Sequence, residues 1–208
     1  MSSSTTDQES ARAERIERRR RQVIVSAAKI LYETGYHGMV MQAVADDAGT
    51  SVGLIYQYFG GKSDVLRAVI LDILEDFHRT VPPAMLAVGD DPEARIRAGF
   101  TTFCTTIDQK REATLLAYRE SQTLTEEGRA ELMRLETETI YPIREAVEDG
   151  IRSGAFREVS SALVAHNLKM AAHGWALKHW DLAAEMSLME YVEAELDLTF
   201  AALRTVGP

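Results

Sequence analysis

Apolar residues recur every three or four positions along almost the whole chain, and this spacing places them on one face of an α-helix. The first such segment is RQVIVSAAKILYETG. Its helix is predicted to end at Gly35, because glycine is common at the end of a helix. No alternating run of β-branched residues and no Asn-Gly hairpin turn occurs, so nothing predicts a sheet. The pattern predicts an all-α protein of about nine helices.

Two short helices and a longer one follow the first segment. VMQAVADDAG ends at Gly49, SVGLIYQYF precedes a Gly-Gly pair, and KSDVLRAVILDILEDF starts at Lys62 with Asp64 in its first turn. A negative charge at that position suits the helix dipole. The two short helices and their glycine-containing turn predict a helix-turn-helix, with Thr50 or Ser51 capping the second helix.

The rest of the chain continues the helical pattern after a turn-rich connection at residues 81–92. Helices are expected over 93–109, 110–122, 125–153, 159–182 and 187–204. Pro142 is expected to start, break or kink the third of these. Ser187 and Glu190 have the spacing of a capping box at the start of the last.

Composition is that of a globular protein, with 46% hydrophobic and 26% charged residues among 208. Cys104 is the single cysteine, which excludes an intrachain disulfide. No apolar run reaches the roughly 18 residues of a membrane span, and no secretory signal begins the chain, so a cytoplasmic protein is expected. We expect a disordered tail over 1–14, a small domain over 15–67 and a larger one over 68–208.

Charge is distributed unevenly between these parts. The net charge is −9, yet residues 11–70 carry nine Lys and Arg against six Asp and Glu, whereas residues 71–208 carry 14 against 24. Residues 11–70 therefore have the net positive charge that binding a polyanion requires, whereas residues 71–208 are net negative.

At the helix-turn-helix the sequence resembles the DNA-binding domain of TetR-family transcriptional repressors, over about residues 20–67. The family pattern is a helix ending in G-[YF], then [IV]-A-x-x-A-G, then S-x-G-x-[IL]-Y-x-[HY]-F and a lysine. The matching residues are Gly35, Tyr36, Val44, Ala45, Ala48, Gly49, Ser51, Gly53, Ile55, Tyr56, Tyr58, Phe59 and Lys62. The resemblance implies a ligand-responsive repressor that binds a palindromic operator in double-stranded DNA as a homodimer.

The resemblance also implies which residues touch DNA. Tyr56, Tyr58 and Lys62 would contact phosphates, and Gln57 is the best candidate for reading a base, since its amide can pair with adenine. Thr50, Ser51, Val52 and Gly53 would lie against the major groove, and Arg18, Arg19, Arg20 and Arg21 would reach the adjacent backbone or minor groove.

The sequence departs from the family pattern at one position and leaves alternatives open at others. Val40 stands where the family usually has Thr or Ser, and Gln42 is the substitute candidate for that phosphate contact. Phe59 is expected in the core, and Tyr56 is expected to pack its ring while aiming its hydroxyl at phosphate. The four arginines could instead form a solvated face, and Gly53 could merely ease a helix crossing.

By the same resemblance, the last two helices would form a four-helix bundle with those of a second copy, exposing apolar faces in a lone chain. The candidate interface residues are Leu163, Leu168, Leu188, Met189, Val192, Leu196 and Leu203. A small, largely apolar effector would bind inside the larger part. The candidate ligand-binding residues are Phe100, Phe103, Tyr118, Arg119, Tyr141, His166, Met170, His173 and Trp175, although an aromatic stripe is more often plain core.

The segments LTEEGRAELMRLE and AHGWALKHWDL faintly resemble TetR-type regulators of lipid and acyl-CoA degradation, which implies such an effector and a basic mouth near Arg119 or Lys178. Effector binding would shift the population toward a form that binds DNA poorly, with residues 62–77 as the lever.

The sequence also bears on two other classes of protein. No nucleophile–base pair, phosphate-binding loop or metal cluster has working spacing, so neither an enzyme nor a cofactor is predicted. His173 and His179 lie far apart around one helix, which disfavours a metal site. A helical small-molecule carrier or partner-binding protein without a DNA role remains the alternative.

Overall fold

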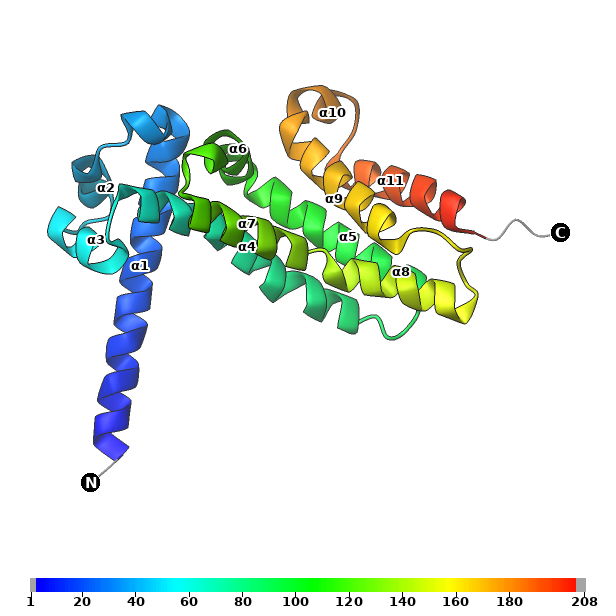
Figure 1. Ribbon diagram of the computed structural model, residues 1–208, viewed down its shortest axis with the longest axis horizontal. Coiled ribbons are helices and arrows are strands. Elements are labelled where there is room, and N and C mark those ends of the chain that lie inside the picture. Colours follow the sequence, from blue (N-terminus) through cyan, green and yellow to red (C-terminus); the bar gives the residue numbers. More distant parts are fainter. Residues whose placement is uncertain (1–2, 205–208) are drawn as a thin grey trace. The chain divides into compact units, whose positions relative to one another are not determined.

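The computed structural model describes residues 3–204, and within that range the chain forms helices and no strand (Figure 1). The predicted all-α fold is confirmed. The helices are α1 (Ser3–Gly38), α2 (Met41–Asp47), α3 (Val52–Phe59), α4 (Lys62–Leu86), α5 (Pro92–Gln109), α6 (Arg111–Glu120), the 3₁₀ turn η1 (Ser121–Thr123), α7 (Glu126–Glu138), α8 (Tyr141–Ser153), α9 (Ser161–Leu177), α10 (His179–Glu185) and α11 (Leu188–Leu203).

The predicted disordered tail is wrong for residues 3–14, which belong to α1; residues 1 and 2 lie outside the described range. From Ala11 onward the segment consists mainly of Ala, Arg and Glu, which are good helix formers even where nothing packs on them. As a result α1 continues well beyond α2 and α3 (Figure 1).

The turn expected at residues 81–92 is also shorter than predicted, because α4 runs through Pro82 and Pro83 to Leu86. Val81 and Met85 are fully buried in this last part of the helix, and their packing outweighs the missing hydrogen bonds. Prolines at 82 and 83 leave the carbonyls of residues 78 and 79 without helical donors, but both residues are exposed, so water can bind them.

Two long predicted helices are each divided in the structure. The segment 125–153 becomes α7 and α8, with Pro142 in the first turn of α8, where a missing N–H costs nothing. The segment 159–182 divides at Lys178 into α9 and α10. The capping box of Ser187 and Glu190 at the start of α11 is confirmed.

The chain folds as two compact units. Unit 1 comprises residues 1–72 together with 116–129, and unit 2 comprises 73–115 and 130–208. This division differs from the expected boundary after residue 67, since the end of α6, η1 and the start of α7 return to the N-terminal unit. Helices α4, α6 and α7 each begin in one unit and end in the other.

Each unit has its own apolar core. In unit 1 the predicted stripes of α1, α2 and α4 meet Ile55 of α3, and Leu31, Val44, Ile55 and Leu66 are all fully buried. In unit 2, α5 packs against α8, α9 and α11. Within residues 3–204, none of the helices combines the length and the apolar character that crossing a bilayer requires.

Candidate nucleic-acid interface and ligand core

The second helix of the helix-turn-helix is held by one capping bond and one buried side chain. Gly49, with φ of 60°, ends the turn after α2, and Ser51 Oγ accepts a hydrogen bond from the Leu54 N–H at 3.2 Å. Ile55 is the buried anchor of α3. Because one anchor faces inward, the opposite side of α3 is left to solvent.

That outer side carries most of the predicted base-reading residues. Ser51, Gly53 and Gln57 are exposed, whereas Thr50 and Val52 are partly buried. A Cβ placed on Gly53 would meet nothing within 4 Å, so the alternative that Gly53 eases a helix crossing is wrong. No neighbouring atom of the protein therefore requires glycine at position 53.

The predicted phosphate-contacting residues have different surroundings. Tyr56 is 46% exposed and Tyr58 is partly buried, so the ring of Tyr56 is less packed than expected. The Lys62 ammonium donates to the His37 carbonyl at 3.3 Å and lies 4.9 Å from the centre of the Tyr36 ring. Lys62 therefore fastens the end of α1 as well as presenting a charge.

Helix α2 begins without a side-chain cap, as the departure at Val40 predicted. Gln42 is exposed, but its amide nitrogen donates to the Asp46 carboxylate at 2.8 Å. A phosphate would have to compete with that carboxylate for the amide, which weakens Gln42 as a substitute contact.

The four arginines of α1 do not share one surface, because consecutive helical residues point in different directions. Arg20 donates to the Tyr58 carbonyl at 2.8 Å, and its guanidinium lies 4.7 Å from the centre of the Phe59 ring. Arg18, Arg19 and Arg21 are exposed. Arg20 thus joins α1 to α3, and Phe59, expected in the core, is a partly buried ring covered by this arginine.

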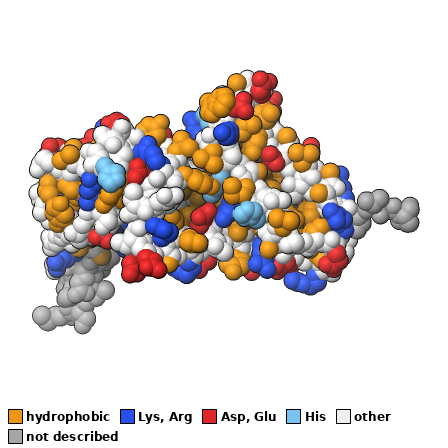
Figure 2. All heavy atoms as spheres, turned by 45° about the horizontal axis from the view of Figure 1, so that its top comes forward, with side chains coloured by type: hydrophobic (Ala, Val, Ile, Leu, Met, Phe, Trp, Pro, Cys, Tyr) orange, Lys and Arg blue, Asp and Glu red, His pale blue; other side chains and the backbone are white. Residues whose placement is uncertain are grey.

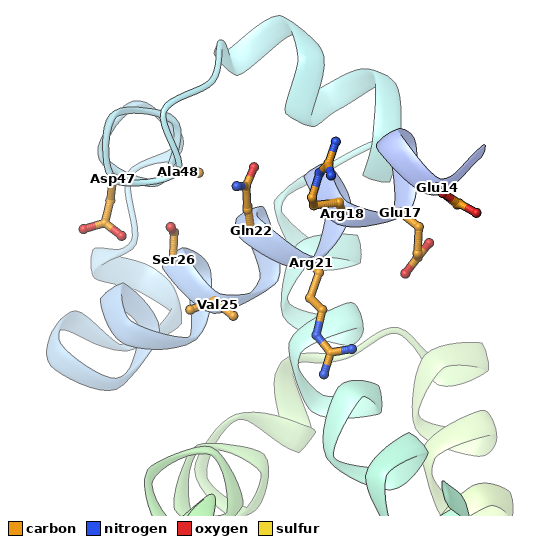
Figure 3. Close-up of a pocket in the computed structure, with 9 residues that line it drawn as sticks. All are labelled: Glu14, Glu17, Arg18, Arg21, Gln22, Val25, Ser26, Asp47 and Ala48. Atoms are coloured by element: carbon orange, nitrogen blue, oxygen red, sulfur yellow. The ribbon is translucent and has the colours of Figure 1, made fainter. Parts of the chain in front are cut away.

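A groove of about 690 Å³ lies between α1 and the end of α2 (Figure 3). Arg18 and Arg21 leave α1 on different sides, and Gln22 and Ser26 face Ala48. Its charged lining residues are Glu14, Glu17, Arg18, Arg21 and Asp47. Three carboxylates and two guanidinium groups therefore line this groove.

Next to the groove, Lys29 donates to Asp47 at 2.8 Å and ties α1 to α2. Hydrogen bonds from Lys29 and Ser26 lower the pKa of Asp47, and the bond to Asp47 raises the pKa of Lys29. These bonds fix the first helix of the motif against the longer α1.

In unit 2 the structure brings together four of the predicted ligand-binding residues: Phe100, Phe103, His173 and Trp175 are all buried. The rings of Phe103 and His173 are stacked at 6.0 Å. The Trp175 indole N–H donates to Asp108 Oδ1 at 2.8 Å, which joins α9 to the end of α5.

The other predicted ligand-binding residues lie elsewhere. Tyr118 and Arg119 belong to unit 1, where Arg119 donates to the Leu31 carbonyl at 2.9 Å. Tyr141, His166 and Met170 are exposed. The structure therefore buries four of the nine residues in the core of unit 2, and the ligand-binding role of all nine stays a prediction.

Two further residues of the unit 2 core were not among the ligand-binding candidates. Phe77 of α4 stacks on Phe103 with ring centres 4.1 Å apart. Asp76 of α4 is buried and pairs with Lys110, which follows α5. The apolar periodicity of α4 gave a signal for Phe77, but no local pattern pairs Asp76 with a lysine so distant in sequence.

Burial sets the protonation of this core. It lowers the pKa of His173 to about 4, so the imidazole is neutral near pH 7. It raises the pKa of Cys104 and of Tyr191, which keeps both protonated. A thiol that stays protonated is a poor nucleophile.

The predicted dimer residues divide into two groups. Leu163 and Met189 are exposed and Leu188 is partly buried. Leu168, Val192, Leu196 and Leu203 are each no more than 2% exposed, so the expectation that they lie on an open face is wrong. They pack inside unit 2, because α9 and α11 turn their most continuous apolar stripes toward α5.

Comparison with known proteins gives matches along both parts of the chain. A family model described as bacterial regulatory proteins, tetR family, matches residues 23–69, and one described as tetracyclin repressor-like, C-terminal domain, matches residues 89–180. The HTH-type transcriptional regulator HbdR of Aromatoleum sp. (strain CIB) is 34% identical over 181 residues, covering 87% of this chain and 79% of HbdR.

Two further similarities are informative. The HTH-type transcriptional activator FasR of Mycolicibacterium smegmatis is 29% identical over 156 residues, covering 75% of this chain and 66% of FasR. The structure of AibR in complex with isovaleryl coenzyme A and operator DNA has a TM-score of 0.73 at 20% identity, covering 88% of this chain and 98% of AibR. At that identity the similarity to AibR shows the fold alone.

Proposed function

Since the chain belongs to the TetR family of bacterial regulatory proteins, whose members are transcriptional regulators rather than enzymes, we propose that it represses transcription from a palindromic operator as a homodimer. Family membership sets aside the alternative of a carrier without a DNA role. The observation that carries the proposal is the outer side of α3, where Ser51, Gly53 and Gln57 are exposed around a position with no side chain.

In this proposal α3 enters the major groove with its N-terminal turn against the base edges. The bare backbone at Gly53 permits close approach, and Gln57 reads a base. Tyr56, Tyr58 and Lys62 hold phosphates, which set the register of the helix but not its sequence preference. Arg18, Arg19 and Arg21 place positive charge against the adjacent DNA backbone. Arg20 holds α1 in position through its contacts with α3.

A homodimer supplies the second reading helix. A two-fold pair places two such helices about 34–36 Å apart, one turn of duplex, and so requires a palindrome. Exposed apolar side chains remain on α9 and α11 for this contact: Leu163 is 58%, Met170 42%, Met189 49% and Leu198 69% exposed. Figure 2 shows hydrophobic side chains interrupting the charged surface on the side that it draws.

The effector is proposed to be a small, largely apolar molecule such as an acyl-CoA, bound in unit 2 among α4, α5 and α9. Stacked rings of Phe77, Phe103 and His173 fill the space between these helices, so side chains rather than backbones separate them. Rings can move aside for an acyl chain at lower cost than helices can. AibR, which shares the fold, is bound to isovaleryl coenzyme A in its structure.

The DNA role is tested by selecting bound duplexes from a random pool and measuring affinity for the selected site by fluorescence anisotropy. Gln57→Ala should weaken binding to that site at least fivefold and relax preference at one base pair, since a bidentate contact contributes about 1–3 kcal/mol. Gln122→Ala, an exposed glutamine elsewhere in unit 1, is the matched control. Equal affinity of both variants would refute the reading role of Gln57, and selection of no palindrome would refute the dimeric operator.

The dimer is tested by sedimentation of Leu198→Glu at micromolar concentration. A buried charge opposite its own symmetry copy should convert the dimer to monomer. Leu86→Glu changes an equally exposed leucine on α4, 76% exposed, and should leave the dimer intact. Identical sedimentation of the two variants would place the interface elsewhere.

The effector is tested by adding isovaleryl coenzyme A, with free coenzyme A as the control, to the protein–operator complex. Loss of operator binding with the thioester alone supports an acyl-dependent site, and loss with neither refutes this ligand class. Transcription in vitro from a promoter carrying the selected site distinguishes repression from the activation that the name of FasR records.

A further inference from the structure

One side-chain nitrogen of unit 2 is buried without a hydrogen-bond partner. His179 is the first residue of α10, and its side chain as a whole is partly exposed. Its Nδ1, however, is shielded from solvent and unpaired, and within residues 3–204 no other buried side-chain nitrogen or oxygen is in that state. An unpaired buried polar atom destabilises the conformation that buries it, so this nitrogen calls for a physical explanation.

The rings next to His179 already have partners for their polar atoms. The imidazole makes a T-shaped contact with the Trp175 ring at 5.1 Å, and Trp175 lies 5.3 Å from the ring of Tyr191. The Trp175 N–H donates to Asp108 at 2.8 Å. The Tyr191 hydroxyl donates to the Ala171 carbonyl at 2.9 Å. His179 Nδ1 is therefore the group of this cluster that has hydrogen-bonding capacity to spare.

Gly174 points independently to a ligand at the same place. It lies inside α9, where glycine is less favourable than alanine. A Cβ on Gly174 would meet the Tyr191 hydroxyl oxygen at 3.7 Å, which is an ordinary contact, and the backbone of Gly174 is not in the left-handed region. Neither packing nor backbone geometry therefore requires glycine there, whereas a molecule bound against α9 beside Tyr191 would require it.

Helix α10, which carries His179, is held lightly. It has seven residues, all of them described by the structure, and none is buried. It begins after Lys178 without a side-chain cap and is followed by extended backbone at Met186. It packs against α9, at whose end it lies in Figure 1. A segment with so little buried surface can shift, and carry the His179 ring off Trp175, without unfolding the core of unit 2.

We infer that His179 is the specificity-determining residue of the effector site, and that its Nδ1 hydrogen-bonds the thioester carbonyl of an acyl-CoA. Without effector, the ring rests on Trp175 with Nδ1 unpaired. With effector bound, α10 shifts and the nitrogen gains its partner. An imidazole that carries its proton on Nδ1 can donate it to a carbonyl oxygen. This inference rests on the proposed effector site in unit 2 and names the group that the site recognises.

The position of the cluster suits the carbonyl rather than the acyl chain. The apolar chain is proposed to lie among the stacked rings of Phe77, Phe103 and His173. Trp175 binds Asp108, which lies five residues after Phe103 and so about 7.5 Å further along α5. The first polar group beyond an acyl chain is its carbonyl, so a chain among the stacked rings directs that oxygen toward the Trp175 and His179 cluster.

The first test varies the ligand and the residue together. Calorimetry gives the dissociation constants of isovaleryl coenzyme A and of the 3-methylbutyl thioether of coenzyme A, which has the same chain but lacks the carbonyl oxygen. Wild type should bind the thioester at least tenfold more tightly than the thioether, and His179→Phe should bind the two within twofold of each other. His78→Phe, which changes an exposed histidine on α4, is the matched control and should keep the wild-type preference.

A tenfold preference that survives in His179→Phe would overturn the inference. Equal affinity of wild type for the two compounds would also overturn it, but would leave the proposed effector class standing. Binding of neither compound by wild type would refute the effector class and the inference together.

The second test uses Gly174→Ala and decides the matter if His179→Phe fails to fold. The melting temperature should not fall, because the added Cβ makes only an ordinary contact. Isovaleryl coenzyme A should nevertheless bind at least fivefold more weakly, since the methyl group occupies space that the ligand needs. Unchanged affinity would overturn the inference. A lower melting temperature would equally overturn it, because the protein itself would then require the glycine.

Discussion

Replacing Gly53 with alanine should change stability and DNA binding in opposite directions. Gly53 is the second residue of α3, its φ is not in the left-handed region, and an added Cβ meets nothing within 4 Å. Alanine loses less backbone freedom on folding, so the free energy of unfolding should rise by about 0.5–1 kcal/mol. For a chain of this length that gain raises the melting temperature by about 2 °C.

Operator affinity should nevertheless fall at least tenfold, which is about 1.4 kcal/mol. The added methyl group lies on the side of α3 that is proposed to meet the base edges, so it holds the backbone away from the duplex. Urea unfolding gives the stability, and fluorescence anisotropy with the selected operator at several salt concentrations gives the affinity.

Gly49→Ala is the control for backbone strain. Its Cβ would also meet nothing within 4 Å, but its φ is +60°, so alanine there should lower stability by about 1 kcal/mol. The reasoning is refuted if the Gly53→Ala protein binds the operator as tightly as wild type. It is equally refuted if affinity falls only in proportion to a loss of stability.

Three further outcomes are expected. Arg20→Met should lower the free energy of unfolding by about 1.5 kcal/mol, whereas Arg19→Met should leave it unchanged and reduce the salt dependence of operator binding by about one ion, measured by urea unfolding and anisotropy. Because burial lowers the pKa of His173 from 6.5 to about 4, its contribution is present above pH 6.5 and is lost as pH falls toward 4. Stability should drop by about 2 kcal/mol between pH 7.5 and pH 5, and His173→Gln should lack this drop in parallel thermal scans. Trp175→Phe should cost about 1 kcal/mol in urea by removing the donor to Asp108; no change would show that water replaces it.

The chemistry of the reading helix could be predicted from sequence because it is local. A glycine turn, a capping Ser51 and an apolar anchor at Ile55 lie within seven residues, and their spacing alone decides which side chains face outward. The division of the arginines could not be predicted this way. Arg20 was distinguished from Arg19 only when α3 placed the Tyr58 carbonyl and the Phe59 ring within its reach.

Prediction from sequence has the same limit for the C-terminal helices. Periodicity located these helices, and Pro142 and Ser187 marked two helix starts from short-range rules. It did not show which of two apolar stripes on α11 turns inward, so Val192 and Leu196 were expected on a surface and lie in the core. The return of residues 116–129 to unit 1 depends on Glu120 meeting a backbone N–H 84 positions away.

The amino-acid sequence by itself determined the all-α class, the helix-turn-helix and the exposed side of α3, because each follows from spacings within one or two turns of helix. Only the tertiary structure decided which charges support the fold and which remain for DNA, and which apolar faces are already covered. Those outcomes depend on partners far apart in sequence. The residues next to a polar side chain do not indicate which distant group it will hydrogen-bond.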